Sequence, residues 1–152
     1  LVGQSDVQFI WQTGKVYYEA IKERLQNEEL PNLKATDFIS DMGAAYKAAD
    51  LVISRAGASS ISEFCLIGKP VILVPSPNVA EDHQTKNAMA LVNRNAAVYV
   101  KDSEAVDVLL KTALHTVGDA KKLESLKENI LKLGLKNSAD IIADEVIKLA
   151  IK

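Results

Sequence analysis

The 152-residue sequence contains one cysteine, has little net charge and lacks long apolar runs. Because Cys65 is alone, the chain cannot form an internal disulfide bond, which fits a reducing cytoplasm. The net charge of −2 at pH 7 lacks the basic excess that is usual for a nucleic-acid binder. No apolar run approaches the roughly 20 residues that a membrane-spanning helix requires. We therefore expect neither a nucleic-acid partner nor a membrane span.

Hydrophobic residues make up 48% of the chain, and short β-branched runs alternate with stretches of helical spacing. Strands are predicted at 7–13, 33–39, 51–54, 71–75 and 96–100, and helices at 16–26, 41–49, 59–68 and 83–94, before an entirely helical remainder. This alternation indicates an α/β fold with a doubly wound, Rossmann-like parallel sheet and helices on both of its faces. The strands at 51–54 and 71–75 are nearly all apolar, so we expect both to be buried centrally.

A sheet of this kind binds ligands beyond the carboxyl ends of its strands, where helix N-termini present free amides. The segments to consider are therefore 38–43, 54–63 and 75–87. In the second of these, Gly57 and Ala58 stand at the start of a helix. Such small residues either let the helix and strand pack closely or leave backbone N–H groups uncovered for a phosphate. The local pattern leaves both alternatives open.

The glutamate in the same segment also has two interpretations. Ser60 and Glu63 have the spacing of a capping box, in which each side chain bonds the backbone N–H of the other residue. Alternatively, the carboxylate of Glu63 accepts hydrogen bonds from two ribose hydroxyls. The local pattern favours the cap.

The first and third segments carry further candidates. Phe38 and Ile39 either pack in the core or form an apolar shelf for a flat ring, with the backbone N–H and C=O of Ile39 free to pair with its edge. Asp82 is expected to cap a helix whose first turn contains His83 and Gln84. The carboxamide of Gln84 offers a donor and an acceptor to sugar hydroxyls, although a solvated first turn explains both residues as well.

Two further side chains have simpler interpretations. Asp41 is expected to cap the helix at 41–49. Trp11 and Cys65 are expected to be core residues without a functional role.

Four motifs give these segments a specific meaning. F-I-x-D-M-x-x-A-Y (38–46), S-R-x-G-A-x-x-x-S-E (54–63), G-K-P-x-I-L-V-P (68–75) and D-H-Q-x-x-N-A (82–88) together resemble the donor-binding half of the MurG family of bacterial glycosyltransferases. The likeness runs from about residue 7 to the C-terminus and is densest over 37–91. It implies the C-terminal half of an inverting GT-B enzyme that transfers N-acetylglucosamine from UDP-GlcNAc to a lipid-linked muramyl-pentapeptide, converting lipid I to lipid II in peptidoglycan synthesis.

The resemblance also implies roles for individual residues. The uracil would lie against Phe38 and Ile39, with Met42 nearby. Arg55 would border the nucleotide, and Glu63 would take the ribose hydroxyls. Gly57, Ala58 and Ser59 would face the diphosphate. His83 and Gln84 would face both the diphosphate and the sugar. Two positions depart from the family pattern, since Ala56 replaces a serine and Ser59 stands where some relatives have an apolar residue.

The resemblance covers only part of a GT-B enzyme. The family's N-terminal acceptor domain and the first βα unit of its donor domain have no counterpart here. We therefore expect residues 1–152 to form a single donor domain with no catalytic residue, no metal, no cofactor and no transfer activity of its own. The lipid-linked acceptor and the cytoplasmic face of the cell membrane, on which the full-length parent would be peripheral, would be reached mainly through the missing domain.

Two alternatives remain. The chain could be the non-catalytic donor subunit of a split GT-B transferase, or part of another UDP-sugar enzyme of this fold such as a UDP-GlcNAc 2-epimerase. The D-H-Q-x-x-N-A segment favours the MurG branch.

Overall fold

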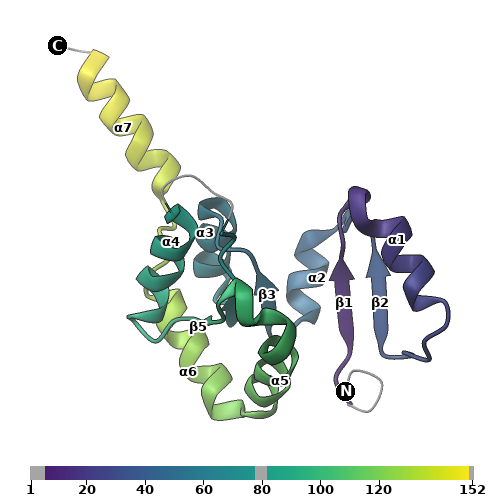
Figure 1. Ribbon diagram of the computed structural model, residues 1–152. Coiled ribbons are helices and arrows are strands. Elements are labelled where there is room, and N and C mark those ends of the chain that lie inside the picture. The colour runs from purple at the N-terminus through teal and green to yellow at the C-terminus, as the bar shows by residue number, and fades with distance from the viewer. Residues whose placement is uncertain (1–5, 78–81, 151–152) are drawn as a thin grey trace.

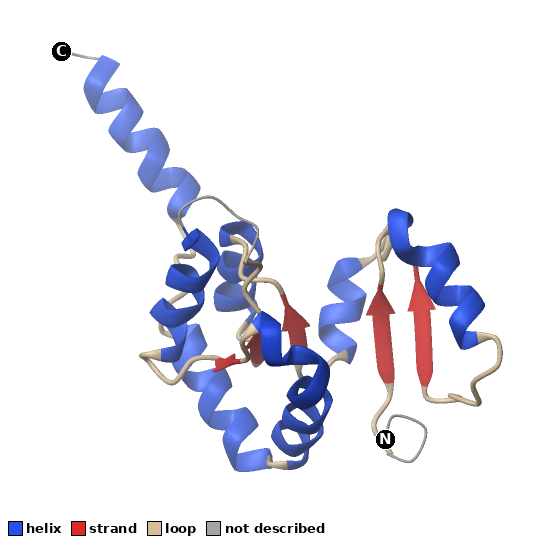
Figure 2. Ribbon diagram, in the orientation of Figure 1, coloured by secondary structure: helices blue, strands red, loops and turns tan. Residues whose placement is uncertain are grey.

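The computed structural model describes residues 6–77 and 82–150, in which strands and helices alternate before a helical C-terminal part (Figures 1 and 2). The alternating elements are β1 (Phe9–Gln12), α1 (Lys15–Leu25), β2 (Leu33–Thr36), α2 (Met42–Ala48), β3 (Val52–Ser54), α3 (Ala58–Ile67), β4 (Val71–Leu73), α4 (His83–Val92) and β5 (Val98–Tyr99). They are followed by the short 3-10 helix η3 (Asp102–Glu104), α5 (Ala105–Gly118), α6 (Ala120–Leu131) and α7 (Ser138–Ala150). The predicted order of elements is confirmed, with strands a few residues shorter than expected.

All strand pairs are parallel, as predicted, but the strands form two sheets instead of one. β1 pairs with β2, with Phe9 opposite Leu33. β4 lies between β3 and β5, with Val52 opposite Val71 on one side and Ile72 opposite Val98 on the other. In a doubly wound sheet the first strand lies at the centre and later strands extend to both sides. We therefore interpret the two sheets as these two flanks, since within the described residues no strand joins β1 to β3.

The hydrophobic core surrounds β4, whose three residues are fully buried. Successive residues of a strand point to opposite faces, and each face of this sheet is covered. Val71 and Leu73 pack with α3 and α4 residues such as Phe64 and Leu91. Ile72 packs on the other side with Ala113 of α5. Helices therefore cover both faces of the three-stranded sheet, as expected.

The prediction that β3 is a fully buried central strand is wrong. Ile53 in its middle is 43% exposed, because β3 has a neighbouring strand on one edge only. Cys65 of α3 is buried in the core as predicted, and this burial raises the pKa of its thiol.

The sheet formed by β1 and β2 contributes little to the core. Among residues 6–45, Asn32 alone is buried. Ile10 is 54% exposed and Trp11, on the opposite face of β1, is 44% exposed, so the prediction that Trp11 is a core residue is wrong. The physical reason is that β1 has β2 as its only strand neighbour, which leaves its second edge and parts of both faces uncovered.

Candidate functional site

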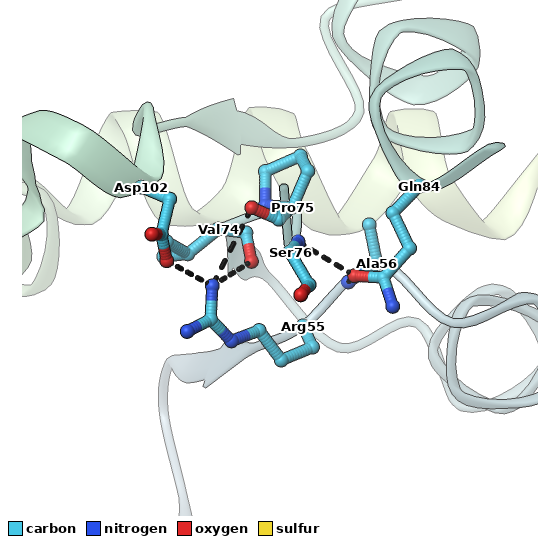
Figure 3. Close-up of polar contacts among 7 residues, drawn as sticks. All are labelled: Arg55, Ala56, Val74, Pro75, Ser76, Gln84 and Asp102. Atoms are coloured by element: carbon cyan, nitrogen blue, oxygen red, sulfur yellow. Dashed lines mark hydrogen bonds and ion pairs between the residues drawn. The ribbon is translucent and has the colours of Figure 1, made fainter. Parts of the chain in front are cut away.

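The carboxyl ends of β3 and β4 lie next to each other, because Ser54 is opposite Leu73 in the register. The segment that follows β3 is held by two side-chain amides of α4. Gln84 Oε1 accepts hydrogen bonds from the backbone N–H groups of Ala56 (3.2 Å) and Ser76 (2.9 Å) (Figure 3). Asn87 Nδ2 donates to the carbonyl oxygen of Ala56 at 3.2 Å. Both polar backbone groups of Ala56 are thus bonded to α4, which fixes the turn between β3 and α3.

Gln84 consequently lies against the turn that was predicted to face a diphosphate. Its carbonyl oxygen is used internally, so its acceptor is not available to a ligand. No hydrogen bond of its Nε2 is found within the described part of the chain, and Figure 3 shows this nitrogen on the side of the carboxamide away from Ser76. Gln84 can therefore act as a hydrogen-bond donor.

Removing the Gln84 carboxamide should destabilise the fold. Gln84→Ala leaves the N–H of buried Ala56 and that of Ser76 without this acceptor, which costs about 1–3 kcal/mol of the free energy of unfolding. Urea denaturation measures the change. Lys86→Ala, at an exposed position on the same helix, serves as the control and should stay within about 0.5 kcal/mol of the unsubstituted chain. Equal stabilities of the two variants would contradict this role of Gln84.

Arg55 extends from the same turn toward the end of β4. Its Nη1 donates to the carbonyl oxygens of Val74 (3.2 Å) and Pro75 (3.4 Å) and forms an ion pair with Asp102 of η3 (Figure 3). The guanidinium therefore connects the ends of two strands with η3. The side chain is more than half exposed, so it remains accessible from solvent at the edge of the sheet.

The turn contains one residue that packs tightly and one that does not. Ala56 is completely buried, so close packing explains its small side chain. Gly57, the N-cap of α3, has an extended backbone (φ −68°, ψ 142°), and a Cβ added there would meet no atom within 4 Å. Neither conformation nor packing requires a glycine at this position. Its missing side chain leaves open space in front of the first turn of α3, whose N–H groups have no partner within the helix.

The capping-box prediction for Ser60 and Glu63 is wrong. Helix α3 begins at Ala58 after Gly57 and has no side-chain cap, so Ser60 is already the third helical residue and Glu63 lies in the second turn. The carboxylate of Glu63 instead accepts a hydrogen bond from the Tyr46 hydroxyl at Oε2, at 3.2 Å, and the residue is exposed.

The loop after β2 presents an aromatic ring at the surface. Phe38 is 62% exposed, so core packing does not explain it. Its N–H donates to Asp37 Oδ1 (2.8 Å), and its carbonyl oxygen accepts from Thr36 Oγ1 (3.1 Å). These bonds hold the loop while the ring faces solvent.

The backbone N–H of Ile39 is not free, contrary to the prediction. It donates to Gln12 Oε1 of β1 at 2.9 Å. Because both groups are exposed, a ligand can take this N–H only by displacing the Gln12 carboxamide. Met42 follows as the first residue of α2, whose N-cap Asp41 accepts from the Ala44 N–H at 2.8 Å, as predicted.

The first turn of α4 is only partly as expected. Asp82 occupies the N-cap position with a positive φ of 55°, but its side chain makes no capping hydrogen bond. His83 begins the helix and is exposed. Residues 78–81 of the predicted segment lie outside the described residues.

The structure therefore brings together the turn after β3, Arg55 and Gln84. Among the described residues no hydrogen bond connects Phe38 or Ile39 with this turn. Sequence reasoning missed the structural roles of Asn87, Asp102, Gln12 and Tyr46. Only Asn87 had a clear signal, because it lies three residues after Gln84 and so shares its helix face.

These features are typical of α/β domains with parallel strands, a class in which ligands bind at the carboxyl ends of the strands next to a helix N-terminus. The sequence profile of the Glycosyltransferase family 28 C-terminal domain matches residues 1–144. The chain belongs to this family.

Curated relatives agree with this assignment. The chain is 67% identical over 147 residues to the UDP-N-acetylglucosamine--N-acetylmuramyl-(pentapeptide) pyrophosphoryl-undecaprenol N-acetylglucosamine transferase of Bacteroides fragilis, covering 96% of this chain and 39% of the relative. It is 68% identical to the Bacteroides thetaiotaomicron protein of the same name, covering 96% of this chain and 40% of that protein. The chain thus spans about two-fifths of the length of these relatives.

Solved structures show the same fold. Acinetobacter baumannii MurG superposes with a TM-score of 0.83 at 29% identity, over 97% of this chain and 45% of that protein. The glycosyltransferase VinC, solved in complex with dTDP, gives a TM-score of 0.67 at 19% identity, over 86% of this chain and 31% of that protein. These likenesses confirm the prediction of one half of a GT-B glycosyltransferase.

Across residues 6–77 and 82–150, none of the helices has the length and apolar character of a membrane span.

Proposed function

We propose that this chain is the UDP-GlcNAc-binding domain of an inverting N-acetylglucosaminyltransferase that converts lipid I to lipid II in peptidoglycan synthesis. The observation that carries the proposal is the open space at Gly57 in front of α3, in a turn that α4 holds rigidly. The relatives at 67–68% identity, which bear the name of this transferase, support the choice of reaction.

In this proposal the first turn of α3 binds the diphosphate. Amides at a helix N-terminus and the positive end of the helix dipole favour an anion, and Gly57, Ala58 and Ser59 leave them accessible. As the bond from the sugar C1 to the diphosphate breaks, negative charge grows on the leaving UDP. The first-turn N–H groups of α3 follow directly after the turn that Gln84 and Asn87 fix at Ala56. They would therefore stabilise that charge without rearranging, which is the source of electrostatic catalysis.

The other predicted residues recognise the remaining parts of the donor. The exposed ring of Phe38 would stack on the uracil, with Met42 nearby, and the N–H of Ile39 would bond the base after Gln12 moves away. Glu63 would accept the ribose hydroxyls, and Arg55 would border the nucleotide. His83 and the Nε2 of Gln84 would donate to the diphosphate and the GlcNAc hydroxyls.

The rest of the reaction belongs to the part of the relatives that this chain does not span. We propose that this part binds the lipid-linked muramyl-pentapeptide, supplies the catalytic base and holds the whole protein on the cytoplasmic face of the membrane. The chain alone would then bind the donor weakly and transfer no sugar.

A titration of the 152-residue chain, followed by NMR, tests the proposal. UDP-GlcNAc should bind more tightly than UDP-GalNAc, and UDP more tightly than GDP, because the Ile39 N–H is proposed to pair with the edge of a uracil. Equal affinity for GDP and UDP, or sugar transfer by this chain without any other protein, would contradict the proposed function.

A further inference from the structure

A tyrosine on α2 touches the glutamate that is proposed to receive the ribose. The Tyr46 hydroxyl donates to Glu63 Oε2 at 3.2 Å. The tyrosine ring packs edge-on against Phe64, with ring centroids 5.7 Å apart and planes at 82°. Phe64 is almost completely buried in the core, so the ring of Tyr46 is held by a rigid neighbour while its hydroxyl reaches the exposed carboxylate.

The ring alone explains the packing, since a phenylalanine would make the same edge-to-face contact. The hydroxyl therefore needs a separate explanation. An exposed carboxylate on a helix samples several rotamers, and a hydrogen bond from a fixed donor selects one of them. A carboxylate has about four acceptor positions, and Tyr46 uses one, which leaves Oε1 and part of Oε2 available to two neighbouring hydroxyls.

The protonation state of the tyrosine suits this role. Partial burial, together with the nearby carboxylate of Glu63, raises the pKa of Tyr46 above its ordinary value. The phenol therefore remains protonated at neutral pH and can donate its hydrogen to the Glu63 carboxylate.

We propose that Tyr46 is a positioning residue for diol recognition: it holds the Glu63 carboxylate in the orientation that accepts the adjacent 2′- and 3′-hydroxyls of a ribose. This inference rests on the proposed function, in which Glu63 binds the ribose of UDP. It adds that α2, which begins directly after the Phe38 loop, connects the base-binding loop with the ribose-binding carboxylate.

The test compares Tyr46→Phe with the unsubstituted chain, using UDP and 2′-deoxy-UDP as ligands. The unsubstituted chain should bind UDP about ten-fold more tightly than 2′-deoxy-UDP, since a hydrogen bond to a charged group is lost with the 2′-hydroxyl. In Tyr46→Phe the affinity for UDP should fall about five-fold, while that for 2′-deoxy-UDP changes less than two-fold. Tyr17→Phe, at an exposed position on α1, is the matched control and should change neither affinity.

The ratio of the two affinities separates positioning from a general structural effect. An equal loss for both ligands, or an unchanged ratio, overturns the inference while the proposed function stands. If the unsubstituted chain binds no UDP, the proposed function itself fails and the role of Tyr46 fails with it. Thermal melting of Tyr46→Phe within about 2 °C of the unsubstituted chain verifies that the variant is folded.

Discussion

Replacing Gly57 with aspartate should abolish binding of UDP while making the fold slightly more stable. Gly57 is the N-cap of α3, where aspartate is preferred over glycine by a few tenths of a kcal/mol because its carboxylate accepts from first-turn N–H groups. The same carboxylate would occupy the space in front of the helix and repel a diphosphate. We expect at least about a hundred-fold loss of UDP affinity, or about 2.7 kcal/mol, in calorimetric titration.

Gly57→Asn is the matched control. Asparagine has the same size and also caps helices well, but it carries no charge. Its UDP affinity should lie between those of the unsubstituted chain and of Gly57→Asp, and all three should melt within a few degrees of one another. UDP affinity in Gly57→Asp within three-fold of the unsubstituted chain would show that the diphosphate does not bind at α3.

A longer chain that supplies a parallel strand between β1 and β3 should be markedly more stable than the 152-residue chain. Ile10, Trp11 and Ile53 are each 43–54% exposed, and full burial of such a side chain contributes about 1.5–3 kcal/mol. Completing the burial of these side chains would therefore add about 1 kcal/mol each to the free energy of unfolding. At about 2–4 °C per kcal/mol for a domain of this size, the melting temperature should rise by about 6–12 °C.

The fluorescence of Trp11 gives an independent measurement of the same effect. It is the single tryptophan of the sequence, so its emission maximum should shift to shorter wavelength in the longer chain as its surroundings become apolar. Trp11→Ala should cost clearly more stability in the longer chain than in the 152-residue chain. Identical emission and melting in both chains would contradict the idea that the two sheets are flanks of one sheet.

The alternation of strands and helices could be predicted because each element has its own hydrophobic periodicity and ends at residues that favour turns. Gly68, for example, ends α3 in the left-handed conformation (φ 66°), which glycine adopts without strain. The division into two sheets could not be predicted from these local patterns. The burial of Ile53 and Trp11 depends on a neighbouring strand, and a strand's own residues do not tell whether both of its neighbours are present.

The start of α3 also shows how far prediction from local sequence patterns can go. The Ser60 and Glu63 pattern suggested a cap, but the helix begins earlier, at Ala58. The turn before it is fixed by Gln84 and Asn87 of α4, and such long-range bonds outweigh a local capping signal. Likewise, the ion pair between Arg55 and Asp102 joins residues 47 positions apart, and no sequence spacing predicts it.

The candidate site was predictable as three separate segments and not as one arrangement. Gly57 and Gln84 were singled out by strand-end position and by the family motifs, and they meet at the turn after β3. The exposure of Phe38 also agrees with its predicted role. The bond between Gln12 and the Ile39 N–H was not predictable, because nothing in the local sequence indicates that a side chain of β1 reaches the loop after β2.

A crystal structure of the 152-residue chain with UDP tests the central claim most directly. The β-phosphate oxygens should lie within hydrogen-bond distance of the backbone N–H groups of Ala58 and Ser59, in the space that a Gly57 side chain would occupy. A diphosphate bound elsewhere, with those amides still facing solvent, would contradict the claim that this turn is built to receive a nucleotide diphosphate.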